Sequence, residues 1–176
     1  MVVQGTIAST GYRNNVAPAD PSKLDADDLL QGGSALVIGG NVTGGIVLAV
    51  APKDTDPNKA DEDGDGIEDA KEGTAKVASY GKAPAMVIGA ADRDVAIGAV
   101  AGTASGFGLQ IEGTVLGDGV YTGVDGNGLA IGGLGGNVTI ANGIGVTGTV
   151  SANSKDAAAT AIRLGAGAST AQIQNG

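Results

Sequence analysis

The segment Gly128-Leu129-Ala130-Ile131-Gly132-Gly133 has close copies elsewhere in the chain, and this recurrence predicts the architecture. The copies begin at residues 35, 85, 128 and 161, so successive starts lie 50, 43 and 33 residues apart. A second phrase, Gly-Thr followed by Val or Ile, begins at Gly5, Gly113 and Gly148. Repeats of this length with variable spacers are typical of solenoids that accept loop insertions. Short Val-, Ile- and Thr-rich runs between glycines predict that the repeating unit is β-stranded.

The composition favours a narrow interior filled by small aliphatic side chains. The 176 residues are 42% hydrophobic but only 2% aromatic, and 33 are glycine. So much glycine is also found in disordered, low-complexity chains, but the alternation in Val138-Thr139-Ile140 favours ordered strands. We expect strands near 2–8, 34–50, 75–80, 85–88, 94–100, 108–115, 128–131, 137–141, 144–150, 160–164 and 170–174.

The charge and the missing residue types narrow the possible functions. A net charge of −9 with ten Lys and Arg disfavours nucleic acid and anionic membranes as partners. The absence of His and Cys excludes Ser-His-Asp and Cys-His catalysis, disulfides and thiolate metal sites. No segment reaches the roughly 18 apolar residues that span a bilayer, and no signal peptide is recognisable. We interpret the chain as one solenoid segment, residues 1–176, of a longer protein.

Two acidic insertions interrupt the repeats, at about 12–31 and 51–74. In the first, Pro21 suits the first turn of a helix, and Ser22 with Asp25 resembles a capping box, so we expect one or two helical turns. If 48–50 is the equivalent of the Gly-Thr-Val phrase, both insertions occupy the same position in the repeat. The two insertions are then expected to be neighbours in space.

The second insertion contains a pattern typical of calcium loops, Asp61-Glu62-Asp63-Gly64-Asp65-Gly66-Ile67-Glu68-Asp69-Ala70-Lys71-Glu72. Carboxylates at loop positions 1, 3 and 5 can converge on one cation, and the glycine at position 6 permits a sharp turn. A backbone carbonyl at position 7 and carboxylates at positions 9 and 12 can complete the coordination. This pattern predicts Ca²⁺ and, as its ligands, Asp61, Asp63, Asp65, Ile67 (through its carbonyl), Asp69 and Glu72. The competing interpretation is a solvated acidic loop.

Residues 54–72 resemble a bacterial thrombospondin type 3 repeat. The resemblance lies in the Asp-Pro-Asn lead-in at 56–58 and the Asp-x-Asp-Gly-Asp-Gly-Ile-x-Asp run that begins at Asp61. It implies calcium binding by the same set of ligands. It also raises the possibility of a second, weaker ion at Asp54, Asp56 and Asn58.

Most of the chain resembles the Gly/Ala-rich passenger segments of alphaproteobacterial autotransporters. The residues that carry this resemblance are 24–33, 143–150 and 159–168. It implies an all-β, right-handed parallel β-helix outside the cell, anchored at the outer membrane by a C-terminal membrane β-barrel of the full-length chain.

The function expected from this resemblance is a non-enzymatic stalk or adhesin segment with a structural calcium loop and a possible surface carbohydrate or protein ligand. Neither nucleic-acid binding nor membrane insertion of this segment is expected. Two alternatives stay open. A polysaccharide-acting enzyme needs a groove of charged residues, and an ice- or surface-binding solenoid needs a regular Thr-x-Thr ladder.

Overall fold

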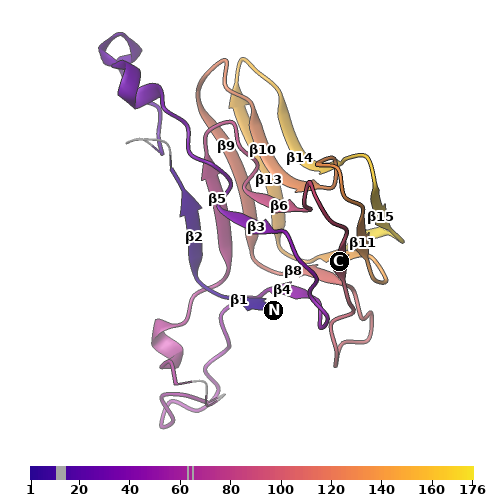
Figure 1. The fold of residues 1–176 in the computed structure, drawn as a ribbon. Helices are drawn as coiled ribbons and strands as arrows, with labels where there is room; N and C mark the ends of the chain where they lie inside the picture. Colours follow the sequence, from indigo (N-terminus) through magenta and orange to yellow (C-terminus); the bar gives the residue numbers. More distant parts are fainter. Residues whose placement is uncertain (11–14, 63, 65) are drawn as a thin grey trace.

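A computed structural model describes residues 1–10, 15–62, 64 and 66–176 (Figure 1). The short 3-10 helices are η1 (Pro21–Lys23), η2 (Ala26–Leu29) and η3 (Asp69–Lys71). The strands are β1 (Val2–Val3), β2 (Thr6–Ser9), β3 (Leu36–Ile38), β4 (Ile46–Leu48), β5 (Lys76–Tyr80), β6 (Met86–Ile88), β7 (Val95–Ile97), β8 (Leu109–Ile111), β9 (Thr114–Thr122), β10 (Gly126–Ile131), β11 (Val138–Ile140), β12 (Ile144–Val146), β13 (Thr149–Lys155), β14 (Ala159–Leu164), β15 (Ala168–Thr170) and β16 (Ile173–Asn175).

The strands form four parallel sheets, which the chain visits in a fixed order. Sheet A is β1-β4-β8-β12-β16, sheet B is β2-β5-β9-β13, sheet C is β3-β6-β10-β14, and sheet D is β7-β11-β15. From β4 onward the chain passes through A, B, C and D and then returns to A beside its previous strand. The first passage has no strand in sheet D, but Val42 forms a parallel bridge to Ile97 there. The fold is therefore parallel and rich in β-structure, as predicted.

The repeat found in the sequence is the structural register of sheet C. Leu36, Met86, Leu129 and Ile162 pair in one row, and Ile38, Ile88, Ile131 and Leu164 pair in another. The Gly-Thr phrases align in sheet B, where Thr6, Lys76, Thr114 and Thr149 share a row. Lys76 shows that Ala75-Lys76-Val77 is the remaining copy of this phrase.

Alternate residues of each strand point into a common core. In sheet A, Leu48 and Ile111 are fully buried and paired, whereas the next outward row contains Val47 and Gln110. Equivalent aliphatic rows from the other sheets complete one hydrophobic cluster. Because successive side chains of a strand alternate between its faces, each short strand contributes one or two residues to this interior.

Glycine at the corner between sheets A and B permits close contact between successive strands. A Cβ on Gly148 would collide with the carbonyl oxygen of Gly113, and a Cβ on Gly113 would collide with that of Ala75. The backbone N–H of Thr149 donates to Gly113 O at 2.9 Å across the same contact. The corner glycines at 113 and 148 are therefore required by lack of space.

The predicted strands are found, but glycine corners divide several of them. The expected strand 2–8 is broken at Gly5, whose φ is +71°. The expected strand 108–115 becomes β8 and the start of β9, and 144–150 becomes β12 and the start of β13. The expected strand 170–174 covers the end of β15, the link that follows it and the start of β16. A change of direction at each corner requires a break in the strand hydrogen bonds.

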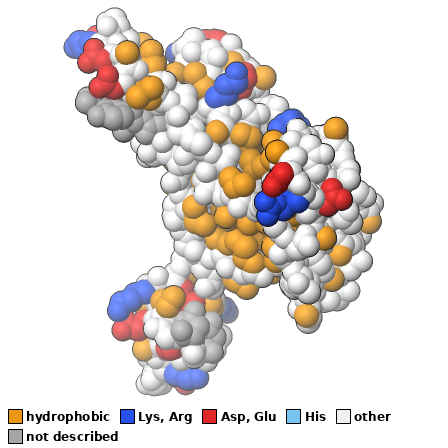
Figure 2. Space-filling view, viewed as in Figure 1, with side chains coloured by type: hydrophobic (Ala, Val, Ile, Leu, Met, Phe, Trp, Pro, Cys, Tyr) orange, Lys and Arg blue, Asp and Glu red, His pale blue; other side chains and the backbone are white. Residues whose placement is uncertain are grey.

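The predicted proximity of the two insertions is wrong. Leu48 pairs with Ile111 in sheet A, so 48–50 is not the equivalent of the Gly-Thr-Val phrase in sheet B. The first insertion follows β2, whereas the second precedes β5, and β2 pairs with β5 in parallel. The insertions therefore leave opposite ends of this strand pair and project in opposite directions (Figure 1). Figure 2 shows charged side chains on both projections and apolar side chains gathered between them.

The first insertion contains the predicted short helical turns, with different caps. Asp20, not Ser22, caps η1, because its carboxylate accepts the backbone N–H of Ser22 at 3.1 Å. The capping box belongs to η2, where the Asp28 carboxylate accepts the backbone N–H of Asp25 at 3.0 Å. The prediction of one or two turns is confirmed.

Candidate metal centre in the second insertion

The second insertion is a long loop whose ends are tied together at the edge of the sheets. The Ala51 N–H donates to the Thr74 hydroxyl at 3.0 Å, and the Ala75 N–H donates to Ala49 O at 2.7 Å. The described part of this loop includes the single turn η3 and otherwise lacks helix and strand. Its shape is therefore set by turns and by polar contacts among its acidic side chains.

Three carboxylates of the loop come together. One oxygen each from Asp54, Glu62 and Asp69 lies within 4.8 Å of the others. Calcium binds oxygen ligands at about 2.4 Å, so two ligands on opposite sides of one ion are about 4.8 Å apart. The spacing of these oxygens therefore fits a single calcium ion.

Asp69 is held in the loop by two hydrogen bonds to the backbone. Its Oδ1 accepts the backbone N–H of Glu62 at 3.2 Å, and its own N–H donates to Ala60 O at 2.8 Å. Its Oδ2 is buried and accepts no hydrogen bond from the described residues. A buried carboxylate oxygen without a donor is costly, and a cation would offset that cost. The residues present therefore fit a hard divalent cation.

Thr55 holds Glu62 in its charged form. The carboxylate of Glu62 accepts the Thr55 backbone N–H at 3.0 Å and the Thr55 hydroxyl at 3.0 and 3.1 Å. The backbone N–H of Thr55 lowers the pKa of Glu62 below its ordinary value of 4.5, with smaller contributions that include the Thr55 hydroxyl and the charge of Lys59. A carboxylate with a lowered pKa stays available as an anionic ligand in weak acid.

Asp61, the predicted first ligand, folds the loop around itself. Its Oδ1 accepts the N–H of Gly64 at 2.8 Å, and its Oδ2 accepts the N–H of Gly66 at 3.1 Å. Both glycines have positive φ, +75° and +93°, which a side chain would disfavour. The glycine positions of the motif therefore serve the sharp turn that the sequence predicted.

The structure describes some of the other predicted ligands and leaves two of them outside the described residues. Asp63 and Asp65 lie outside the described residues. Ile67 has a side chain that is 46% exposed, which suits a residue predicted to act through its backbone. Both carboxylate oxygens of Glu72 are buried. Asp69 is the predicted ligand that belongs to the group of three carboxylates.

Sequence reasoning did not name Glu62 as a ligand, and it grouped Asp54 with Asp56 and Asn58 for a possible second ion. Glu62 stands at an even position of the loop, where alternation directs a side chain away from positions 1, 3 and 5. Asp54 was assigned to a second ion with Asp56 and Asn58, but it lies beside Glu62 and Asp69. Asp56 instead accepts the backbone N–H and the side-chain amide of Asn58 at 3.1 and 3.2 Å. These contacts depend on how the loop reverses, which spacing alone does not specify.

No protein-family model, curated protein or solved structure matches the chain. Among the described residues, no helix is long and apolar enough to cross a membrane.

Proposed function

We propose that the chain is a segment of a right-handed parallel β-helix that serves as a non-enzymatic stalk or adhesin segment of an autotransporter passenger at the cell surface. The observation that carries this proposal is the cyclic order of the four parallel sheets, each strand of which lies beside its counterpart from the previous passage. Crossover connections between parallel strands are right-handed in almost all proteins, which favours the same hand here. The full-length chain would supply a C-terminal membrane β-barrel as the anchor.

A stalk of this kind derives its stiffness from hydrogen bonds along its axis. The backbone bonds between passages, such as Thr114 N–H to Ala75 O at 2.8 Å, run from one repeat to the next. Each repeat also buries aliphatic residues against its neighbours, so unfolding one repeat exposes part of the next. These features suit a rod that holds a surface away from a membrane.

Calcium is the proposed structural ion of the second insertion. Asp54, Glu62 and Asp69 would hold it, together with those predicted ligands that lie nearby in the loop. The ion would neutralise the converging carboxylates and fix the loop at the edge of sheets A and B. Its proposed role is structural, because the group lies in an inserted loop whose described residues form no regular structure beyond η3.

The two alternatives have less support. An ice-binding face needs two in-register threonine columns. The outward row of sheet B is Thr6, Lys76, Thr114 and Thr149, and the outward row two positions on is Ala8, Ala78, Leu116 and Ser151. Lys76 interrupts the first column, and the second contains no threonine. A polysaccharide-acting enzyme would need charged residues in a groove, and between residues 75 and 176 the sequence has few charged residues, scattered along the chain.

Surface labelling tests the proposed location. Intact cells that produce the full-length protein are incubated with an antibody raised against residues 75–176. The proposal predicts labelling without permeabilisation and its loss after external protease treatment. Labelling that requires permeabilisation would contradict a surface stalk.

A further inference from the structure

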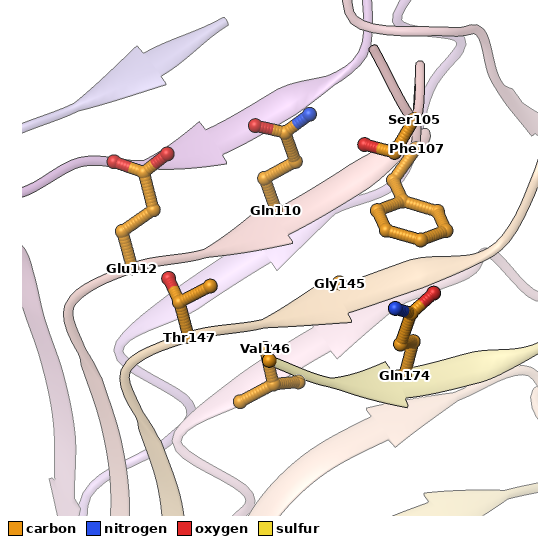
Figure 3. Close-up of a pocket in the computed structure, with 9 residues that line it drawn as sticks. Ser105, Phe107, Gln110, Glu112, Gly145, Val146, Thr147 and Gln174 are labelled. Carbon is orange, nitrogen blue, oxygen red and sulfur yellow. The ribbon is translucent and has the colours of Figure 1, made fainter. Parts of the chain in front are cut away.

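A cavity of about 270 Å³ lies on the outer face of sheet A, and none of its lining residues belongs to either insertion (Figure 3). Strands β8, β12 and β16 form its floor, and the loop before β8 overhangs it. The cavity is lined, among others, by Phe107, Gln110, Glu112, Gly145, Thr147 and Gln174.

The cavity exists because a glycine interrupts a row of outward side chains. Gln110, Gly145 and Gln174 are paired across β8, β12 and β16. The two glutamines are separated by two interstrand spacings, about 9.6 Å between backbones, and the strand between them contributes no side chain of its own at this position. The Phe107 ring packs over Gly145, since a Cβ there would be 2.5 Å from the ring atom Cδ2, and the cavity lies beside this ring. The cavity is therefore bordered by amides on two sides and by an aromatic ring.

The amide of Gln110 is held in one orientation. Gln110 is 8% exposed, and its Nε2 donates to the Thr103 hydroxyl at 3.0 Å. That hydroxyl also accepts the Gly106 N–H at 3.2 Å and donates its single hydrogen to Val100 O at 3.4 Å. Because a hydroxyl has only one hydrogen to donate, the Gln110 group that faces Thr103 must be the NH₂ group. The Gln110 carbonyl oxygen therefore points away from Thr103, toward the side on which Glu112 lies (Figure 3).

The polar groups around the cavity are distributed along its rim. Gln110 Oε1 and the Glu112 carboxylate can accept hydrogen bonds, the Thr147 hydroxyl can donate and accept, and the Gln174 amide lies at the other side of the opening (Figure 3). A single ammonium group would need acceptors that converge on one point. A ring that carries several hydroxyl groups matches a spread of acceptors and donors, and its apolar C–H groups match Phe107.

We infer that this cavity is a binding site for a neutral pyranose sugar. The carboxylate of Glu112 and the net charge of −9 disfavour an anionic sugar such as a uronate. The inference deepens the proposed adhesin function, because it names the ligand class of that surface. It does not depend on calcium, since the residues that form the cavity lie between 105 and 176.

An NMR titration tests the inference. The ¹⁵N-labelled protein is titrated with methyl β-glucopyranoside, methyl α-mannopyranoside and methyl β-galactopyranoside, with sodium glucuronate and n-butylammonium chloride as charged probes. The side-chain amide signals of Gln110 and Gln174 report directly from opposite sides of the cavity. A site of this size predicts saturable shifts of both signals by one of the neutral sugars, with a dissociation constant of roughly 0.1–10 mM.

Matched variants connect the shifts to the cavity. Glu112→Ala is expected to weaken sugar binding about tenfold, because a hydrogen bond to a charged group is lost. Thr147→Val is expected to weaken it by a smaller factor. The controls are Glu68→Ala in the second insertion and Thr139→Val on the exposed face of sheet D, and both are expected to bind as the unchanged protein does.

Three results would overturn the inference: no saturable shift with any neutral sugar at about 50 mM, stronger binding of a charged probe, or unchanged binding in Glu112→Ala. The titration is repeated with a calcium chelator. Sugar binding that survives chelation is expected, so a failed calcium loop and a failed sugar site give different results.

Discussion

Tyr121 donates its hydroxyl hydrogen to the backbone carbonyl of Asp28 at 2.7 Å, although 93 positions separate the two residues. Tyr121 is 8% exposed and lies in the extended end of β9, and Asp28 belongs to η2 of the first insertion. Leu24 and Leu29 line the same small cavity beside Tyr121. The first insertion is therefore docked onto the strand end.

Tyr121→Phe should loosen the first insertion. Loss of a hydrogen bond to a buried carbonyl costs about 1 kcal/mol. Hydrogen exchange measured by mass spectrometry is expected to become faster in residues 20–30 and to stay unchanged in sheet C. Tyr80→Phe is the matched control, because the Tyr80 hydroxyl takes part in a longer contact of 3.5 Å with Lys76. Equal exchange in both variants would show that the hydroxyl does not hold the insertion.

The sequence predicted the register of sheet C because all four copies of its aliphatic phrase face the same core. In sheet B one copy was hidden. Ala75 replaces the corner glycine, and Lys76 occupies an outward position where any polar side chain is tolerated. Only Val77 keeps the Gly-Thr-Val pattern, so residues 48–50 match the phrase better in the sequence. That match predicts the wrong corner for the second insertion. A repeat can be recognised in the sequence where the core restricts the residue type in every copy. It is obscured at positions that face solvent, where the residue type varies.

Gly148→Ala should destabilise the fold at the corner between sheets A and B. The added Cβ would meet the carbonyl oxygens of Gly113 and Glu112, which are backbone atoms that cannot move independently. We expect the free energy of unfolding to fall by about 1–3 kcal/mol in urea denaturation. Gly40→Ala is the control, because its Cβ meets nothing within 4 Å, and its effect should stay within about 1 kcal/mol. Similar effects of the two substitutions would contradict the close strand contact.

Ile88→Ala tests whether the stacked rows form the stabilising core. Ile88 is fully buried in the cluster, so its truncation should cost about 2–5 kcal/mol. Val37→Ala in the neighbouring strand is the comparison. Val37 is 57% exposed, and its loss should change stability by about 0.5 kcal/mol or less. A larger cost for Val37 than for Ile88 would reverse the assignment of inward and outward rows.

The titration of Glu62 should reflect its hydrogen bonds with Thr55. Its pKa in the folded chain lies below the ordinary 4.5, so the charged form stabilises the loop above that pH. This contribution is lost as the pH falls below 4.5 through the lowered pKa. NMR of the Glu62 side chain should show a midpoint below 4.5. In Thr55→Val the midpoint should rise but stay below 4.5, because the backbone N–H remains. Equal midpoints in the unchanged protein and in Thr55→Val would contradict the bonds that the Thr55 hydroxyl donates to Glu62.

The candidate site was only partly predictable. The spacing of acidic residues and glycines in the loop identified Asp61 and Asp69 as important, and both carboxylates accept loop N–H groups. Asp54 and Glu62 reach Asp69 through a chain reversal that no residue periodicity encodes. A loop without regular structure has no fixed period, so the partners of its side chains follow from its three-dimensional path.

Calcium titration by calorimetry on chelator-treated protein is the most direct test of the proposed metal centre. We expect saturable binding in the unchanged protein and its loss in Asp69→Asn, since Asp69 belongs both to the predicted ligands and to the observed group. Asp54→Asn should weaken binding more than Asp56→Asn if the observed group holds the ion. Asp156→Asn, an exposed aspartate in sheet B's loop, should bind as the unchanged protein does. No saturable heat up to about 10 mM calcium, or full binding by Asp69→Asn, would contradict a calcium site in this loop.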